Sequence, residues 1–128
     1  MSHDDRPVRI VLDTSAILAY ARGSIHVGEP LAEVTDENAV AVLPSLCLAE
    51  ARWMVGDTTR LKILLEHPAT AVMATSSDWR TLAELQKVVG TLDATSAVAL
   101  AMDHRGVVLT ARSGLYAGLE GGGPIIGI

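Results

Sequence analysis

Three acidic residues stand at places where carboxylates could take part in metal-assisted chemistry: Asp13, Glu50 and Asp93. Asp13 ends an apolar run, Glu50 lies in an apolar helical stretch, and Asp93 opens an Ala-rich stretch. Carboxylate oxygens are the ligands that Mg²⁺ and Mn²⁺ prefer. A cation held in this way can polarise a phosphodiester and activate a water molecule for in-line attack. The pattern predicts a divalent-metal site, provided that the fold gathers the three acids.

Asp13 has two alternative roles, one structural and one chemical. The near-continuous β-branched run Val8–Leu12 predicts a buried strand, and a helix follows at once. Asp is a favoured helix N-cap, so Asp13 could cap this helix. Thr14 or Ser15 could also cap it, which would leave Asp13 free to point out from the strand end. We expect that second arrangement, because ligands of open α/β sheets bind beyond the carboxyl ends of the strands.

Glu50 interrupts an otherwise apolar helical stripe. One helix face, at the i, i+3, i+4 and i+7 spacing, is formed by Leu46, Ala49, Glu50 and Trp53. We expect this face to pack against the core, where an unpaired carboxylate is costly. Glu50 must then meet a partner or rise to a rim. The structural alternative is an ion pair with Arg52 or another arginine at the edge.

Asp93 stands in the first turn of the predicted helix Leu92–Arg105. A first-turn acid complements the helix dipole or caps the helix, and this is the structural alternative for Asp93. Placed at a helix start beside the sheet, Asp93 could also face the same end as Asp13. Asp103, near the other end of this helix, is expected to face solvent or an arginine.

The composition restricts the class of protein. The formal net charge of the 128 residues is −5, which argues against nonspecific coating of nucleic acid, because such binding depends on many Lys and Arg contacts to phosphates. It does not exclude a site that binds a cation first and a phosphate through it. Cys47 is the only cysteine; it fits a reducing cytoplasm and is expected in the core. No run reaches the length of a membrane span, so we expect a cytoplasmic protein without a membrane segment.

Strands alternate with helices along the chain, which predicts crossover connections and a mainly parallel sheet. We expect one domain over residues 1–128, with residues 1–7 as a loose leader, folded as a three-layer α/β/α sandwich. The expected strands are Val8–Leu12, Val40–Leu43, Thr70–Thr75, Val107–Thr110 and Ile125–Ile128. The expected helices are one that follows Asp13 and ends near Arg22, then Leu31–Asn38, Leu46–Val55, one from Asp57 or Thr58 to the residue before Pro68, Trp79–Val89, Leu92–Arg105 and a short one over Ser113–Leu119.

Four segments together resemble the PIN domain, and specifically the small VapC-type toxin ribonucleases. They are Ile10–Ala16 (IVLDTSA), Leu46–Glu50 (LCLAE), Leu92–Ala94 (LDA) and Gly106–Thr110 (GVVLT). They occur in the family's order and cover nearly the whole chain, and the first is the most specific. The resemblance implies a compact α/β/α sandwich whose acids collect at one end of the sheet. It also implies hydrolysis of single-stranded or structured RNA with Mg²⁺ or Mn²⁺.

Matched residue by residue, the resemblance implies a role for each motif residue. Asp13, Glu50 and Asp93 would be the catalytic, metal-binding acids. Ser15 and Thr110 would be supporting hydroxyls that hold the carboxylates in place. The resemblance also implies a homodimer and a small antitoxin protein, a segment of which enters the active groove.

One departure from the family pattern lies after the fourth expected strand. The family commonly has Thr, any residue and then Asp, whereas this chain has Thr110-Ala111-Arg112. A positive charge in place of a fourth acid should weaken the binding of a second cation. Arg112 could instead contact a phosphate, because a guanidinium binds phosphate bidentately. The departure bears on catalytic strength more than on the fold.

Two functions other than a metal-dependent endoribonuclease stay open. In the first, Arg112 has displaced the metal, and the fold serves as an RNA- or protein-binding module without turnover. In the second, Asp13 accepts a phosphoryl group at the strand end. The second has little support, because the sequence has no acid pair next to Asp13 and no convincing lysine after a late strand. The endoribonuclease is the leading hypothesis.

Overall fold

The computed structural model describes residues 5–128, so residues 1–4 of the expected leader lie outside the described part. Its strands are β1 Val8–Leu12, β2 Val40–Pro44, β3 Thr70–Met73, β4 Val107–Thr110 and β5 Ile125–Gly127. They form one five-stranded parallel sheet in the order β3-β2-β1-β4-β5. Parallel neighbours require crossover connections, which helices and short turns supply here.

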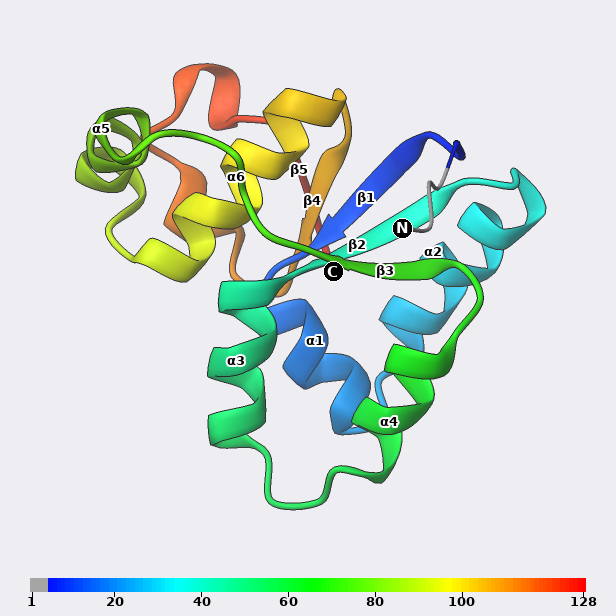
Figure 1. The fold of residues 1–128 in the computed structure, drawn as a ribbon. Helices are drawn as coiled ribbons and strands as arrows, with labels where there is room; N and C mark the ends of the chain where they lie inside the picture. Colours follow the sequence, from blue (N-terminus) through cyan, green and yellow to red (C-terminus); the bar gives the residue numbers. More distant parts are fainter. Residues whose placement is uncertain (1–4) are drawn as a thin grey trace.

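Helices cover both faces of this sheet, and this confirms the predicted three-layer α/β/α sandwich. The helices of the described residues are α1 Thr14–Ala21, α2 Ile25–Asp36, α3 Ser45–Met54, α4 Thr59–Glu66, α5 Trp79–Val89 and α6 Leu92–His104. Two short 3₁₀ turns, η1 Ser113–Tyr116 and η2 Glu120–Gly122, precede β5. Figure 1 shows α1–α4 together on one side of the sheet and α5 and α6 on the other. None of the helices in residues 5–128 is long and apolar enough to cross a bilayer.

The core is aliphatic and lies between the sheet and the inner faces of the helices. β2 is buried along its whole length, because both faces of a covered parallel sheet are closed to water. α6 is buried continuously over residues 94–101, and its small side chains let it lie close to β1 and β4. The burial of this helix holds its first turn in a fixed place beside the sheet.

α2 differs most from its expected bounds. The sequence predicted Leu31–Asn38, but the helix runs over Ile25–Asp36. Its true start is capped by Ser24, whose side chain accepts a hydrogen bond from the backbone N–H of His26 at 3.2 Å. Pro30 obscures this start in the sequence, because proline in a helix interior is unfavourable by about 3 kcal/mol. The burial of one apolar face of α2 against the sheet offsets that cost.

The face of α3 that carries Glu50 is not the core face. Every member of the predicted stripe is exposed, up to 85% for Trp53. Cys47 and Ala51 are buried instead, on the side where α3 packs against α1 and α6. Small side chains are needed there because the three helices approach closely at this edge. The prediction of a core stripe was therefore wrong, and Glu50 is an exposed side chain.

The predicted site residues gather at the carboxyl edge of the sheet. β1 ends directly before Asp13, and β4 ends at Thr110. α6 starts at the same edge, because the chain must return to the amino-terminal edge before β4 can run parallel to β1. Asp93, in the first turn of α6, is thereby carried to the end of the sheet where Asp13 lies.

Candidate active site

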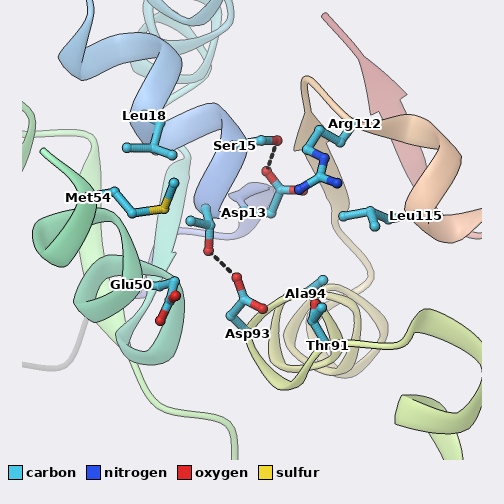
Figure 2. A pocket seen from close by; sticks show the side chains of 11 residues that line it. Asp13, Ser15, Leu18, Glu50, Met54, Thr91, Asp93, Ala94, Arg112 and Leu115 are labelled. Atoms are coloured by element: carbon cyan, nitrogen blue, oxygen red, sulfur yellow. Dashed lines mark hydrogen bonds between the residues drawn. The ribbon is translucent and has the colours of Figure 1, made fainter.

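The three predicted acids line one pocket at the carboxyl edge of the sheet, with a volume of about 240 Å³. Figure 2 shows Glu50 on one side of this pocket and Arg112 on the other. Asp13 and Asp93 lie between them. The other lining side chains include Thr14, Ser15, Leu18, Met54, Thr91 and Leu115. The pocket thus brings together every predicted site residue except Thr110, which lies behind it.

Asp13 is almost fully buried, at 2% exposure, and accepts three hydrogen bonds. Its Oδ1 accepts from the Ser15 hydroxyl at 2.6 Å and from the backbone N–H of Ala16 at 3.0 Å. Its Oδ2 accepts from the Tyr116 hydroxyl at 2.6 Å. The bond from Ala16 makes Asp13 the N-cap of α1, so the prediction of a cap at Thr14 or Ser15 was wrong. The carboxylate has two oxygens, so Asp13 caps the helix and lines the pocket at once.

Ser15 and Thr110 form a chain of hydroxyls that ends on Asp13. Ser15 Oγ and Thr110 Oγ1 are 3.1 Å apart. Because the Ser15 hydroxyl gives its one proton to Asp13, the Thr110 hydroxyl is the donor to Ser15. The backbone N–H of Ala111 also donates to Ser15 Oγ, at 2.9 Å. Both predicted supporting hydroxyls therefore lie where they orient the Asp13 carboxylate.

Asp93 is partly exposed and hydrogen-bonds to the start of α1. The Thr14 hydroxyl donates to Asp93 Oδ2 at 2.5 Å, a bond drawn in Figure 2. Burial alone would raise the pKa of Asp93, but hydrogen bonds from the Thr14 and Thr91 hydroxyls and from backbone N–H groups outweigh it and hold this pKa below its usual value. Asp93 is therefore a charged carboxylate at neutral pH, and its place in the first turn also complements the dipole of α6.

Cys47 supports the same turn of α6 from within the core. It is fully buried, and its thiol donates to the backbone carbonyl of Asp93 at 3.1 Å. Burial raises the pKa of the Cys47 thiol to about 12, so the thiol stays protonated at neutral pH. The prediction of a core cysteine is confirmed.

Glu50 projects from α3 at the exposed rim of the pocket. It forms no ion pair with any of residues 5–128, so the alternative of a pair with Arg52 is not seen. It also lines a shallow continuation of the pocket, of about 320 Å³, between α3 and the start of α6. Leu46 and Leu92 form the apolar walls of this continuation. Glu50 is thus an exposed carboxylate in the lining that also contains Asp13 and Asp93, two carboxylates held by hydrogen bonds.

Arg112 brings a positive charge to the side of the pocket opposite Glu50. It is exposed and forms no ion pair within the described part of the chain. Its backbone N–H donates to Thr110 Oγ1 at 2.9 Å, which fixes the turn after β4. A guanidinium at this place can hold a phosphate group bidentately.

Sequence reasoning missed Tyr116, which is fully buried and bonded to Asp13. The sequence predicted only that it belongs to a short helix over Ser113–Leu119; the structure has the 3₁₀ turn η1 over Ser113–Tyr116. A buried tyrosine hydroxyl usually has a hydrogen-bond partner, so burial of Tyr116 would predict an acceptor near its hydroxyl. The sequence does not show that Tyr116 is buried, so the signal was incomplete.

The carboxylate and hydroxyl oxygens that line the pocket suit a hard divalent cation. Across residues 5–128, no group of three His, Cys, Asp or Glu side chains lies close enough to hold a metal ion. Mg²⁺ keeps several waters and is commonly bound by only one or two carboxylates. The residues present therefore fit a partly hydrated cation on one or two acids, and not an enclosed one.

A larger cavity, of about 680 Å³, lies at the opposite, amino-terminal edge of β1 and β2. Two of its arginines are engaged in the fold: Arg6 donates to the Pro68 carbonyl at 2.8 Å, and Arg9 pairs with Glu37 at 3.0 Å. Its lining contains one carboxylate, Asp5, and none of the predicted site residues. The chemistry that the sequence predicts is therefore confined to the carboxyl edge.

No protein-family model and no curated protein sequence matches this chain. Among solved structures, the chain is similar to the crystal structure of PAE2754 from Pyrobaculum aerophilum, with a TM-score of 0.63 and 18% sequence identity. The match covers 97% of this chain and 92% of that one. At this identity the likeness establishes a shared fold over nearly the whole of both chains.

Proposed function

We propose that this protein is a Mg²⁺- or Mn²⁺-dependent endoribonuclease of the PIN-domain, VapC-toxin type. The observation that supports the proposal is the convergence of Asp13, Glu50 and Asp93 on one pocket, although they come from three separate segments of the chain. The pocket lies at the carboxyl edge of a parallel sheet, where open α/β folds bind their ligands. The carboxylate oxygens of the pocket, which suit a hard divalent cation, and the nearby Arg112 together suit a phosphodiester substrate.

In this proposal the chain positions the substrate and the cation by separate devices. Asp13 and Asp93 are held by hydrogen bonds, so their charges are ordered before any ligand arrives. Glu50 is exposed and can close on the ligand from the other side. Arg112 binds a phosphate oxygen pair of the RNA backbone. A bound divalent cation supplies Lewis-acid stabilisation of the reacting phosphodiester.

The test is cleavage of labelled single-stranded and structured RNA by the purified protein. Cleavage should require Mg²⁺ or Mn²⁺ and stop with a chelator, and Asp13→Asn, Glu50→Gln and Asp93→Asn should abolish it. Asp103→Asn is the matched control, because Asp103 is an exposed acid at the other end of α6. If the pure protein, free of any antitoxin, cuts no RNA with either metal, the enzyme proposal fails.

The second candidate is an RNA- or protein-binding module without turnover. Two observations favour it: the guanidinium of Arg112 places a positive charge at the pocket, and residues 5–128 contain no enclosed group of metal ligands. Calorimetric titration with Mn²⁺ separates the candidates. Binding that is lost in Asp93→Asn counts against the module, whereas RNA binding without Mn²⁺ binding or cleavage supports it.

The phosphoryl-acceptor alternative has less support, because both Asp13 oxygens already accept hydrogen bonds in a buried place. Acetyl phosphate should therefore fail to label the protein. The partners that the resemblance implies belong to the same proposal: an RNA substrate, a second copy of the chain in a homodimer, and a small antitoxin, all in the cytoplasm. Light scattering during gel filtration tests the dimer.

A further inference from the structure

Tyr116 is joined to the candidate site by one hydrogen bond and takes no part in the pocket lining. Its side chain is fully buried, and its hydroxyl donates to Asp13 Oδ2 at 2.6 Å. A carboxylate oxygen accepts, so the phenol O–H is the donor in this bond and Oδ2 of Asp13 is the acceptor.

The number of donors on Asp13 limits what the pocket can use. A carboxylate offers roughly four lone-pair directions, two on each oxygen. The Ser15 hydroxyl and the backbone N–H of Ala16 occupy Oδ1, and the Tyr116 hydroxyl occupies one direction on Oδ2. One direction, on Oδ2, is left for a ligand in the pocket that Asp13 lines.

Tyr116 is itself held in place by the chain around it. It ends η1, which packs against α5 and β5. The backbone N–H of Leu119 donates to the Tyr116 carbonyl at 3.0 Å. This segment is far from β1 in the sequence, 103 residues from Asp13, so the bond ties the carboxyl-terminal turn to the site.

We propose that Tyr116 is a positioning residue, which orients the Asp13 carboxylate so that one lone pair of Oδ2 is presented to a divalent cation. The proposal rests on the proposed function for the identity of that ligand. The orientation itself is a property of the protein without metal, because all three donors belong to the chain. Groups that hydrogen-bond to metal ligands typically change metal affinity 10–100-fold when they are removed.

The experiment compares Tyr116→Phe with the parent protein in two measurements. The first is Mn²⁺ binding by calorimetry, in which the variant should bind about tenfold more weakly or worse. The second is a crystal structure without metal, in which the Asp13 carboxylate of the variant should turn from its parent orientation. Tyr20→Phe is the matched control, because Tyr20 is the other of the two tyrosines and lies half-buried on α1, outside the pocket. It should leave both measurements unchanged.

Each outcome decides the proposal. Unchanged Mn²⁺ affinity in Tyr116→Phe, with a parent that binds Mn²⁺, overturns the positioning role and leaves the proposed function standing. If the parent neither binds Mn²⁺ nor cleaves RNA, the proposed function fails. The crystal structures without metal then decide the positioning role: a turned Asp13 carboxylate in Tyr116→Phe supports this role, and an unmoved one overturns it.

If Tyr116→Phe does not fold, the parent protein is measured instead. The Tyr116 hydroxyl proton should then shift in NMR spectra when Mg²⁺ is added, and an unmoved resonance overturns the proposal.

Discussion

The Thr14 hydroxyl donates a 2.5 Å hydrogen bond to Asp93 Oδ2 and so joins the start of α1 to the first turn of α6. The two residues are 79 positions apart in the sequence. Thr14 directly follows Asp13, so the bond also sets the distance between two candidate metal ligands. The hydroxyl favours the charged form of Asp93 and opposes the effect of its burial.

Thr14→Val should raise the pKa of Asp93, because it removes a donor that favours the ionised carboxylate. In the parent this pKa is depressed, so the stability that it contributes is present above the unfolded-state pKa and is lost as the pH falls through the folded-state pKa. In the variant the folded-state pKa lies closer to the unfolded-state value, so this loss should be smaller and should be complete at a higher pH. ¹³C NMR titration of the Asp93 carboxyl carbon measures the shift directly.

Thr14→Ser is the matched control for this prediction, because it keeps the hydroxyl and removes only a methyl group. Its Asp93 should titrate as in the parent protein. Equal Asp93 pKa values in Thr14→Val and the parent would show that the Thr14 bond does not act on the carboxylate in solution.

Ser15→Ala should destabilise the protein by about 1–3 kcal/mol, because it leaves the buried Asp13 carboxylate short of a donor and breaks the chain from Thr110. Urea denaturation followed by circular dichroism measures the change. Ser76→Ala is a suitable control, because Ser76 is exposed in the loop between β3 and α5. A loss in Ser15→Ala no larger than in Ser76→Ala would contradict the hydroxyl chain.

Much of the fold could be predicted because its signals are local. The bounds of Val8–Leu12 and Val107–Thr110 are correct, since buried parallel strands appear as continuous apolar runs. The bounds of Trp79–Val89 are correct because Asp78 caps the start and Gly90, with a φ of 98°, ends the helix. α2 was placed too late because its stability depends on packing against the sheet, which the local sequence does not reveal.

The site could be predicted in its residues but less well in its geometry. Asp13, Glu50 and Asp93 do share a pocket, yet the prediction of Glu50 depends on its helix face lying in the core, and that face is exposed to solvent. Which face of α3 turns inward depends on the close approach of α1 and α6, a tertiary effect. Tyr116 could not be found, because its bond to Asp13 spans 103 residues and has no periodic signal.

Tyr116 should show no phenolate signal until the protein unfolds in base. Its folded-state pKa is raised, so the stability that its burial contributes is fully present below the unfolded pKa of about 10 and is lost as the pH rises above it. Ultraviolet titration of Tyr20→Phe, in which Tyr116 is the only tyrosine, should give a phenolate signal that appears together with the loss of helix. Ionisation in a protein that keeps its circular dichroism spectrum would contradict the buried hydrogen bond.

Removing the charge of Arg112 tests whether its guanidinium contacts an RNA phosphate. If Arg112 contacts a phosphate, Arg112→Gln should weaken metal-free RNA binding and reduce the slope of log affinity against log salt by about 1. Arg112→Lys should keep that slope but lose affinity, because lysine lacks the bidentate geometry. Arg22→Gln, an exposed arginine at the end of α1 outside the pocket, controls for general charge and should change affinity less.

Arg112→Asp adds an acid at the position where the resembled family commonly has one, and it tests the opposite role of this site. Its carboxylate should strengthen Mn²⁺ binding, because it replaces a repelling charge beside the pocket with an oxygen ligand. Faster RNA cleavage in this variant would mean that the missing acid limits turnover. Stronger Mn²⁺ binding with slower cleavage would mean instead that the loss of the guanidinium contact outweighs the added ligand. Arg112→Gln removes the guanidinium without adding an acid, so comparison of the two variants separates these effects. Equal Mn²⁺ affinity in the parent, Arg112→Gln and Arg112→Asp would show that position 112 takes no part in cation binding.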